Sequence, residues 1–450
     1  MMDLDITFAE IAEMNESATY ETNFRIGSVS TDTRHISPGD TFVAIHGEKF
    51  DGHDFIEDAI SNGAGAVISS RNIACDVPVL VVNDTIEALG NIASGYRKKF
   101  KGKVVGITGS NGKTTVKEML KHICEQSMSV SATVANNNNK IGVPLTVLSA
   151  NQDDDVWLVE MGTSEKGEIP YLANMIPPDV SVITNISESH LEGFGTREDV
   201  FQEKSTIIAG MVDSGTAVMN FSPPWFDQTS KMFKSANLIS FGFDQSADIH
   251  CDYESHSTGF SVKAMAGNRT ISYTLKVPGE HNVINSLTAI AVAISVGVSD
   301  EDIVQGLESF QGVKGRMEVK TLGNGITLIN DSYNASPASV GAALKSLSLY
   351  KGRRLFVFGG MAELGEKSES FHAEVGDEAV QANVDGLYVF GNCAKPTFDR
   401  YPGEKYFTEN MQDLLNMLNE NVSSDDVVLV KGSRAFRMER VADFLEDIRG

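Results

Sequence analysis

The chain has 450 residues, a hydrophobic content of 41% and a formal net charge of −24 at pH 7. Its length predicts about three domains, and its hydrophobic content is sufficient for several cores. Because no basic run occurs, this acidity excludes nonspecific nucleic-acid binding and attraction to an anionic membrane surface, and no apolar run approaches the ~18 residues of a transmembrane helix.

Cysteine usage and the first residues indicate the cellular compartment. The four cysteines are scattered and form no Cys-x-x-Cys pair, which is typical of reduced thiols rather than of a disulfide framework or a zinc site. The N-terminal segment lacks a basic stretch followed by an apolar one, so we expect no signal peptide. We therefore expect a cytoplasmic protein. We also expect it to act as a monomer.

The first segment of the chain, residues 1–82, predicts a small α/β domain. It contains three short β-type runs, at residues 41–45, 66–68 and 79–82. Pro78 precedes the last run, at a position where a strand can begin. After this segment, residues 83–85 have the composition of a helix start, and the apolar residues that follow share one helical face.

Residues 104–115 form the most informative stretch of the chain. An apolar β-type run leads into a glycine-rich loop, and a lysine and two threonines then open a helix. Such a loop directs backbone N–H groups at a phosphate, and the helix N-terminus favours negative charge. We expect a nucleoside triphosphate to contact a set of seven residues, the phosphate loop: Gly109, Ser110, Asn111, Gly112, Lys113, Thr114 and Thr115.

Two of these side chains have specific expected roles. Lys113 would reach the β- and γ-phosphates, and the hydroxyl of Thr114 would bind Mg²⁺. The alternative is a chance glycine turn before a helix. The order of strand, loop, lysine and helix favours the nucleotide site.

Alternating strand and helix patterns from Lys103 onward predict parallel α/β sheets. A second such pattern begins near residue 313. We therefore expect an N-terminal domain at residues 1–82, a central phosphate-loop mononucleotide-binding domain with a parallel sheet at 83–313, and a Rossmann-like α/β domain at 314–450. The main predicted strands of the last two domains lie at residues 156–159, 180–183, 326–329, 355–358, 386–390 and 427–430.

Polar residues follow several of these strands, at the sheet edge where ligands of open α/β sheets bind. Glu160 follows one buried-type strand, and Thr184-Asn185 follow the next. Glu160 beside a phosphate loop is a natural partner for the Mg²⁺ of bound ATP, although a lone carboxylate there could also cap a helix. By themselves, His190 and Lys204 are typical of a surface or core histidine and of a solvated helix residue.

The phosphate loop departs from the general pattern in one respect that identifies a family. Ile107 occupies the position of the first glycine, with Gly106 and Gly109 on either side of it. The string Thr-Gly-Ser-Asn-Gly-Lys-Thr-Thr resembles the loop of the Mur ligase family, ATP-dependent enzymes that build the peptide of bacterial cell-wall precursors. The resemblance extends from Ser30 to Arg434, with the motifs in family order.

The resemblance implies two Mg²⁺ ions. Glu160 lies in a string similar to the family's Glu-(Leu/Met)-Gly-Ala-Asn-x-x-Gly-Glu-Ile, with Thr163-Ser164 in place of Ala-Asn. His190 resembles the histidine that binds the second Mg²⁺. Lys204, fourteen positions later, resembles a lysine that is carbamylated in many members. A carbamate would provide the anionic oxygen that Mg²⁺ prefers.

The resemblance also implies the ATP contacts. Asn285 would bond the adenine, with His281 and Asn282 beside it, and Arg316 would reach the transferred phosphate. Asp331 would contact the ribose, and Asn334 would lie at the nucleotide. The family's Gly-Asp-Met-Ala string has Gly360 in place of its aspartate here.

Substrate contacts implied by the resemblance lie in three places. The N-terminal segments would bind a UDP-sugar, with Phe50 stacked on uracil, although a turn-rich surface loop is the alternative from the residues alone. Asn138 would lie near the sugar-peptide, with a plain loop amide as its alternative, and the C-terminal string would face the peptide. The implied substrate-binding residues are Ser30, Asp32, Thr33, Arg34, Lys49, Phe50, Asp51, Gly52, His53, Asn138, Lys431, Ser433 and Arg434.

Three strings, at residues 49–55, 141–146 and 331–334, resemble motifs of the family members that join D-alanyl-D-alanine to UDP-N-acetylmuramoyl tripeptide. The Asp-Asn-Pro-Arg string of the diaminopimelate-adding relative is absent. The implied reaction forms an acyl phosphate on the tripeptide, which the dipeptide amine then attacks. Lys113 and Arg316, with the two ions, would neutralise the charge of an anion attacking an anion. Closure of the outer domains over the central one would exclude water.

Three alternatives remain from the sequence. Another Mur ligase or a folylpolyglutamate synthetase-like enzyme would share the ATP chemistry, but the second has its phosphate loop near the N-terminus. A nonenzymatic nucleotide-binding regulator would not need Lys113, Glu160, His190 and Lys204 together. A generic phosphate-loop ATPase or kinase fits the shifted glycines less well.

Overall fold

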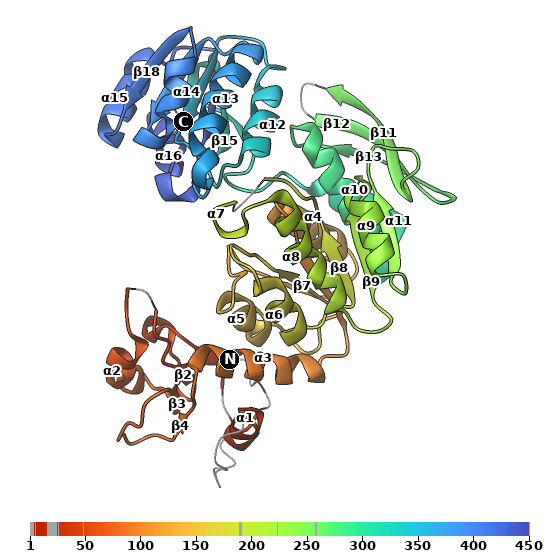
Figure 1. Ribbon diagram of the computed structural model, residues 1–450, viewed down its shortest axis with the longest axis vertical. Helices are drawn as coiled ribbons and strands as arrows, with labels where there is room; N and C mark the ends of the chain where they lie inside the picture. Colours follow the sequence, from red (N-terminus) through yellow and green to blue (C-terminus); the bar gives the residue numbers. More distant parts are fainter. Residues whose placement is uncertain are drawn as a thin grey trace.

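A computed structural model describes residues 4, 6–15, 25, 27–47, 49–188, 191–222, 224–256 and 259–449. It contains three sheets, and each predicted domain contributes one of them. The three parts follow one another along the longest axis of the molecule (Figure 1), with the N-terminal sheet at one end and the C-terminal sheet at the other. Every helix in the described ranges is too short or too polar to cross a membrane.

The N-terminal sheet is parallel, and the predicted strands 41–45, 66–68 and 79–82 are confirmed within one or two residues. Phe42 and Val67 are buried against Ile56 of the helix that covers one face. The strands run in the order β1-β2-β3-β4, with helices α1 and α2 beside them. Their bounds are β1 (Val29–Ser30), β2 (Thr41–Val43), β3 (Ala66–Ser69), β4 (Val79–Val81), α1 (Phe8–Met14) and α2 (Ile56–Ser61).

Helix α3 (Thr85–Lys99) joins the N-terminal part to the central one. It begins where predicted, because Asp84 caps it by accepting hydrogen bonds from the N–H groups of Ile86 and Glu87. It packs on α1 and on central helices α5 (Gly142–Ser149) and α6 (Glu168–Met175). Arg97, near its end, bonds Asp179 at 2.9 Å. The helix therefore joins the N-terminal and central strands in one continuous core.

The central sheet has the strand order β13-β12-β11-β10-β9-β8-β5-β7-β6. Strands β5 to β11 pair in parallel, as predicted, whereas β11 to β13 form an antiparallel extension that was not predicted. Its sequence signal was the alternation of apolar and polar residues along residues 269–275, which are alternately buried and exposed in the structure. The bounds are β5 (Lys103–Thr108), β6 (Val130–Ala132), β7 (Val156–Glu160), β8 (Val180–Ile183), β9 (Thr216–Asn220), β10 (Asn237–Phe241), β11 (Ile249–His256), β12 (Gly259–Ala266) and β13 (Arg269–Leu275).

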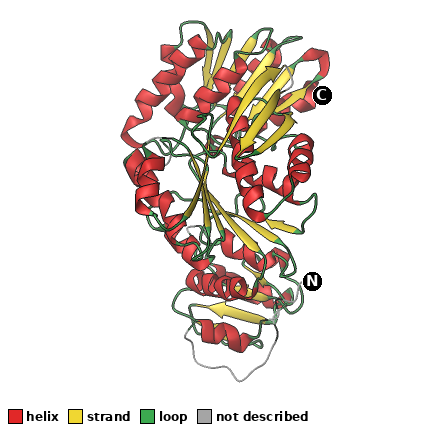
Figure 2. Ribbon diagram, turned by 90° about the vertical axis from the view of Figure 1, so that its right-hand side faces the viewer, coloured by secondary structure: helices red, strands yellow, loops and turns green. Residues whose placement is uncertain are grey.

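Alternate residues of the central strands enter two different cores, one on each face of the sheet. Val104 and Trp157 pack with α3, α5, α6 and α8 (Arg197–Ala209), whereas Val105 and Leu158 pack with helices α4, α10 and α11. Figure 2 shows these helix layers flanking the strands. The other helices of this domain are α4 (Lys113–Cys124), α7 (Leu191–Phe194), α9 (Trp225–Met232), α10 (Glu280–Val296) and α11 (Asp300–Ser309).

The C-terminal sheet has the order β14-β15-β19-β16-β17-β18 and is parallel except for β14. Helices cover both faces, as a Rossmann-like domain requires, and two separate cores result. The bounds are β14 (Glu318–Thr321), β15 (Thr327–Asp331), β16 (Arg354–Phe358), β17 (Gly386–Phe390), β18 (Glu404–Thr408), β19 (Val427–Lys431), α12 (Pro337–Leu347), α13 (Ser368–Gln381), α14 (Lys395–Arg400), α15 (Met411–Asn421) and α16 (Glu439–Arg449).

Gly306 of α11 lets this helix press against α4, whose N-terminus carries the phosphate loop. A Cβ atom at Gly306 would lie 2.7 Å from the backbone nitrogen of Ile123 and 2.8 Å from the carbonyl oxygen of His122. We expect Gly306→Ala to lower the free energy of unfolding by about 1–2 kcal/mol, because the clash with backbone exceeds the gain of about 1 kcal/mol in helix propensity. Thermal unfolding measures this difference.

Gly341 of α12 is the matched control. A Cβ atom there would meet only the mobile carboxylate end of Glu378, at 3.1 Å. We expect Gly341→Ala to be neutral or stabilising by up to about 1 kcal/mol. Equal destabilisation by both substitutions would contradict the packing argument.

Candidate active site

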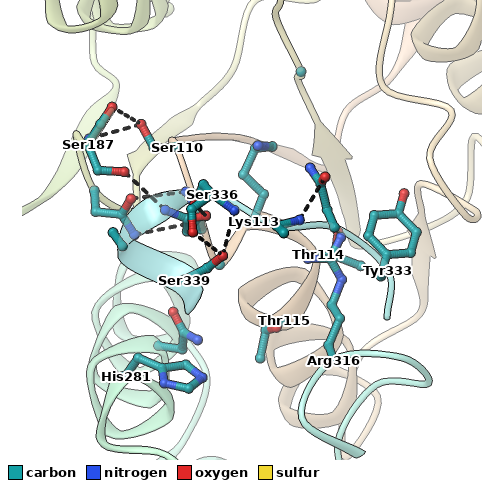
Figure 3. Close-up of a pocket in the computed structure, with 18 of the residues that line it drawn as sticks. Ser110, Lys113, Thr114, Thr115, Ser187, His281, Arg316, Tyr333, Ser336 and Ser339 are labelled. Atoms are coloured by element: carbon teal, nitrogen blue, oxygen red, sulfur yellow. Dashed lines mark hydrogen bonds between the residues drawn. The ribbon is translucent and has the colours of Figure 1, made fainter. Parts of the chain in front are cut away.

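A cavity of about 790 Å³ lies between the central and C-terminal domains. The phosphate loop forms its floor, and residues from the ends of β7 and β15, the start of α10 and the loop before β14 form its walls (Figure 3). The predicted nucleotide residues Asn285, Arg316, Asp331 and Asn334 all line it. The structure thus brings together side chains that are far apart in the sequence, and Ser336 bonds Asn111 across 225 positions.

The phosphate loop has the backbone conformation that its glycines predict. Gly109 has a φ of +144°, and a side chain there would collide with Thr184. Gly112 has a φ of +83° and precedes α4, and a Cβ atom there would lie 2.6 Å from the amide oxygen of Asn285. Glycine is therefore required at both positions, one by contact with β8 and one by contact with α10.

Residues after β8 brace the phosphate loop. The backbone N–H groups of Ser110 and Asn111 donate to the carbonyl and the side-chain oxygen of Asn185, each at 3.0 Å. The hydroxyl of Thr184 donates to the carbonyl of Asn111 at 2.5 Å. Ser187 bonds the side chains of both Ser110 and Asn111 (Figure 3). These bonds fix the loop in shape before a ligand binds, which lowers the entropic cost of binding.

Lys113 begins α4 and donates a hydrogen bond of 2.8 Å from its ammonium to the carbonyl of Gly109. Burial lowers the pKa of this ammonium, the carboxylate of Glu160 raises it, and Arg316 lowers it. A phosphate anion would relieve the desolvation and the repulsion between the two cations. Lys113 is therefore suited to an anionic ligand at the N-terminus of α4.

Thr114 and Glu160 form the predicted metal pair. The hydroxyl of Thr114 donates to one carboxylate oxygen of Glu160 at 2.8 Å, and the amide of Asn138 donates to the other at 2.9 Å. Glu160 is only 2% exposed, and the hydroxyl of Thr133 fixes its backbone N–H. A carboxylate and a hydroxyl at a phosphate loop are hard oxygen donors that fit Mg²⁺.

Phosphate oxygens and water would complete such a coordination shell, since Mg²⁺ usually keeps several non-protein ligands. In the part of the chain that the structure describes, no three His, Cys, Asp or Glu side chains cluster as a metal site. His190, the predicted ligand of a second ion, lies outside the described residues. Its role stays a prediction.

Lys204 is 1% exposed on α8, and burial lowers its pKa well below the usual value. The positive charge of Lys113 acts in the same direction, whereas Glu203 and Glu168 oppose the shift. Across the described residues, no hydrogen bond or ion pair reaches its ammonium. Two other lysines are equally buried but are bonded: Lys117 to the carbonyl of Thr133, and Lys431 to Asp331.

Glu203 and Glu168 organise the loop between Glu160 and α6. The carboxylate of Glu203 accepts from the N–H groups of Gly167 and Ile169, each at 2.8 Å. That of Glu168 accepts from the N–H groups of Ser164 and Glu165 at 2.8 and 3.1 Å. Ser164, where the family pattern has asparagine, thus contributes its backbone to a turn that Glu168 closes.

Arg316 reaches the phosphate loop from the C-terminal side of the cavity. Its guanidinium donates to the hydroxyl of Thr114 at 2.9 Å and lies 4.1 Å from the centre of the Tyr333 ring. Ser336 makes a second bond between the domains, to the side chain of Asn111 at 3.1 Å. The predicted nearness of Arg316 to the transferred phosphate agrees with this geometry.

Asp331 and Lys431 form a buried ion pair at the ends of two adjacent strands. The ammonium of Lys431 lies 2.5 Å from one oxygen of Asp331 and 3.0 Å from the carbonyl of Asn334. The other oxygen of Asp331 accepts from the N–H of Met317 at 3.1 Å. In this structure the ammonium of Lys431 therefore binds groups of the same chain, and its predicted contact with the peptide substrate stays a prediction.

The other C-terminal residues differ in exposure. The hydroxyl of Ser433 donates to the carbonyl of Ala335 and accepts from the N–H of Ala362, so it joins three loops. Arg434 is 62% exposed, is paired with Glu439 and lines the cavity. Arg434 is thus the most accessible of the three predicted peptide contacts, Lys431, Ser433 and Arg434.

The predicted adenine wall lies at the start of α10. His281 and Asn285 line the cavity, and burial lowers the pKa of His281. The amide of Asn285 donates to the side-chain oxygen of Asn282 at 3.0 Å, and that of Asn282 donates to the carbonyl of Pro278 at 2.7 Å. The chain of amides fixes the orientation of Asn285 beside the phosphate loop.

The predicted UDP-sugar residues form a separate group in the N-terminal domain, away from the cavity. They lie at or after the carboxyl ends of the parallel strands β1 and β2, the usual ligand edge. Phe50 is 73% exposed, and Lys49 and Arg34 are also exposed, which leaves them available to a ligand.

Asp51 and His53 bond each other in that group, with 2.6 Å between the Asp51 carboxylate and His53 Nδ1. Bonds from the backbone and ring of His53 and from Arg71 lower the pKa of Asp51, and His53 Nε2 accepts from the N–H of Ser70. Since these polar atoms already have partners, we expect this pair to shape the loop that presents Phe50.

The backbone conformation and the close neighbours of Gly360 explain why glycine replaces the aspartate of the family pattern there. It has a φ of +85°, and a Cβ atom there would lie 2.8 Å from the sulfur of Cys393 and 3.3 Å from His372. An aspartate would be strained and crowded at this position. Sequence reasoning gave no role to Tyr333, Glu203 or Lys117, whose contacts depend on partners brought near by folding.

Comparison with known proteins gives three family matches along the chain. The Mur ligase family, catalytic domain matches residues 25–97, the Mur ligase middle domain matches 107–293, and the Mur ligase, glutamate ligase domain matches 315–434. The second match contains the phosphate loop, Glu160 and Asn285, and the third contains Arg316 and Lys431.

Individual relatives match over nearly the whole length. The UDP-N-acetylmuramoyl-tripeptide–D-alanyl-D-alanine ligase of Escherichia coli is 34% identical over 453 residues, with 99% of each chain covered. A crystal structure of MurF from Acinetobacter baumannii superposes with a TM-score of 0.90 at 31% identity and covers 98% of each chain. MurF ligase from Thermotoga maritima in complex with ADP gives a TM-score of 0.84 at 31% identity and covers 93% of this chain and 97% of the other.

Replacement of Lys431 by methionine tests the buried ion pair. Asp331 would lose its partner while only 13% of its side chain is exposed. We expect Lys431→Met to cost about 3 kcal/mol in the free energy of unfolding of the C-terminal domain, measured by denaturant unfolding. The double variant Lys431→Met, Asp331→Asn should regain at least half of the loss, because no charge is left unpaired. A double variant as unstable as the single one would show that the charge is not the cause.

Proposed function

The chain belongs to the Mur ligase family, and on that premise we propose that it is an ATP-dependent ligase joining D-alanyl-D-alanine to UDP-N-acetylmuramoyl tripeptide. The reaction yields ADP and phosphate and belongs to cytoplasmic synthesis of peptidoglycan precursors. The observation that carries the proposal is the arrangement of Lys113, Thr114, Glu160 and Arg316 around one point of the cavity. The full-length relatives described above support the choice of substrates.

In the first step, the terminal carboxylate of the tripeptide attacks the γ-phosphate of ATP and forms an acyl phosphate, with ADP leaving. Two anions must approach each other, so the site has to supply positive charge. Lys113 and the N-terminus of α4 would contact the phosphates from the central domain, and Arg316 would contact them from the C-terminal domain. Mg²⁺, held by Thr114 and Glu160, would neutralise phosphate oxygens when bound.

In the second step, the free amine of D-alanyl-D-alanine attacks the acyl carbon, phosphate leaves and a peptide bond forms. The acyl phosphate must be kept from water until the amine arrives. Contacts between domains, from Arg316 to Thr114 and from Ser336 to Asn111, close the cavity on the nucleotide side. The N-terminal group around Phe50 would bind the UDP end, with Asn138 nearer the sugar-peptide.

Two other functions are compatible with the same fold and ATP site. A sister ligase that adds a single amino acid would use the same ATP site with a different acceptor. A nonenzymatic nucleotide-binding regulator would keep the fold without the chemistry. Folylpolyglutamate synthase from Mycobacterium tuberculosis shares the fold at 16% identity, which says nothing about substrate. We expect the protein to act as a monomer.

Phosphate release from ATP and Mg²⁺ tests the proposal. Release should require both UDP-N-acetylmuramoyl tripeptide and D-alanyl-D-alanine, with a pentapeptide product by mass, and Lys113→Ala should lower its rate at least ~100-fold because it removes charge stabilisation of the transition state. Release with a dipeptide precursor and a free amino acid instead would assign a sister ligase. Failure to release phosphate with any acceptor would favour the regulator.

We further propose that Lys204 is carbamylated and, with His190, binds a second Mg²⁺. Carbamylation needs a neutral amine, and burial, which lowers the pKa of Lys204, favours the neutral form. Among the described residues no hydrogen bond or ion pair would have to break before this nitrogen reacts with CO₂. A carbamate would provide an anionic oxygen, the kind of ligand that Mg²⁺ prefers.

Labelling with ¹³C-bicarbonate tests this modification by NMR. We expect one carbamate signal in the protein and none in Lys204→Arg, whose guanidinium cannot react. Lys117→Arg is the matched control, because Lys117 is equally buried but bonded to Thr133, and the signal should persist in that variant. A signal that survives Lys204→Arg would contradict the assignment.

A further inference from the structure

Tyr333 lines the cavity at the exit of β15, and neither the reaction nor the substrates have given it a role. The guanidinium carbon of Arg316 lies 4.1 Å from the centre of its ring, within the range of a cation–π contact. The same guanidinium donates to the hydroxyl of Thr114 at 2.9 Å. Figure 3 shows Tyr333 and Thr114 beside the end of the Arg316 side chain.

The backbone around this contact is also tied together. The N–H of Tyr333 donates to the carbonyl of Gly315 at 3.1 Å, and that of Met317 donates to Asp331 at 3.1 Å. Met317 has a φ of +52°, an uncommon conformation for a residue with a side chain. The turn that carries Arg316 is thus bonded on both sides of the arginine to the segment that carries Tyr333.

An arginine side chain loses considerable freedom when it is fixed on a ligand. A ring that already restricts its plane removes part of that loss from the binding step. From this geometry we propose that Tyr333 is a positioning residue, whose ring presets the guanidinium of Arg316 over Thr114 for the γ-phosphate of ATP. This inference rests on the proposed function, because it takes the partner of Arg316 to be the transferred phosphate.

The ring acts through Arg316 and does not touch the reacting atoms. It should therefore affect a nucleoside triphosphate but not a diphosphate, which lacks the group that Arg316 would meet. The phenol hydroxyl is not required, so Tyr333→Phe should behave like the unaltered protein. Tyr333→Leu, which removes the aromatic face, should weaken the effect of Arg316.

The test compares the dissociation constants of ADP and of a triphosphate analogue with a non-hydrolysable β–γ bridge, both with Mg²⁺. We expect Tyr333→Leu to raise the dissociation constant of the analogue about 5- to 10-fold and to lower kcat by a similar factor. The dissociation constant of ADP should not change. In an Arg316→Ala background the same substitution should have no further effect on the analogue. If Tyr333→Leu does not fold, Tyr333→Gln makes the same comparison.

Three outcomes overturn the inference. Equal weakening of ADP binding and of analogue binding would show a general structural role. A loss that persists in the Arg316→Ala background would show that the ring acts on the nucleotide directly or through Arg434, whose guanidinium carbon lies 5.8 Å from the ring centre. An effect of Arg316→Ala without an effect of Tyr333→Leu would show that the ring is not needed. If Arg316→Ala itself leaves analogue binding and turnover unchanged, the proposed role of Arg316 fails, which is a separate result.

Discussion

The hydroxyl of Thr114 is the point on which the active-site arrangement depends. It donates to Glu160 of the central domain and accepts from Arg316 of the C-terminal domain, while the preceding residue, Lys113, supplies an ammonium. A cation, an anion and the start of a helix therefore meet at one atom. Charge neutralisation of a triphosphate requires such a concentration of donors, because the net charge of the whole chain, −24, repels an anion.

Much of the surrounding structure keeps these groups in place. Thr184 and Asn185 bond the phosphate loop from β8, and α11 presses on α4 where Gly306 leaves room. On the other side of the cavity, the Asp331–Lys431 pair fixes the turn that follows Arg316. These supports come from three elements of the central domain and two strands of the C-terminal domain, so the site forms only when both domains have folded and docked.

Local features of the site could be predicted from the sequence, whereas distant pairings could not. The order of strand, glycine loop and helix identified Lys113 and Thr114, and a polar residue after a buried strand identified Glu160, because each pattern lies within a few residues. The family resemblance placed Arg316 at the transferred phosphate, but its contact with Thr114 spans 202 positions, and the contact of Lys431 with Asp331 spans 100. Such contacts depend on domain docking and strand order, which no local pattern contains. The antiparallel extension was missed for a different reason. Its alternation of apolar and polar residues is present at residues 269–275, but the three strands continue a sheet whose earlier strands are parallel, and the prediction extended that parallel pattern.

Positional isotope exchange in ATP tests the central claim, that this site transfers the γ-phosphate to a carboxylate before the amine takes part. ATP labelled with ¹⁸O at the β–γ bridge would be incubated with Mg²⁺, the protein and UDP-N-acetylmuramoyl tripeptide, without D-alanyl-D-alanine. Reversible formation of an acyl phosphate should move the label into non-bridging positions of the β-phosphate, and omission of the tripeptide should abolish the exchange. Exchange without the tripeptide, or exchange that appears only with D-alanyl-D-alanine present, would contradict the account.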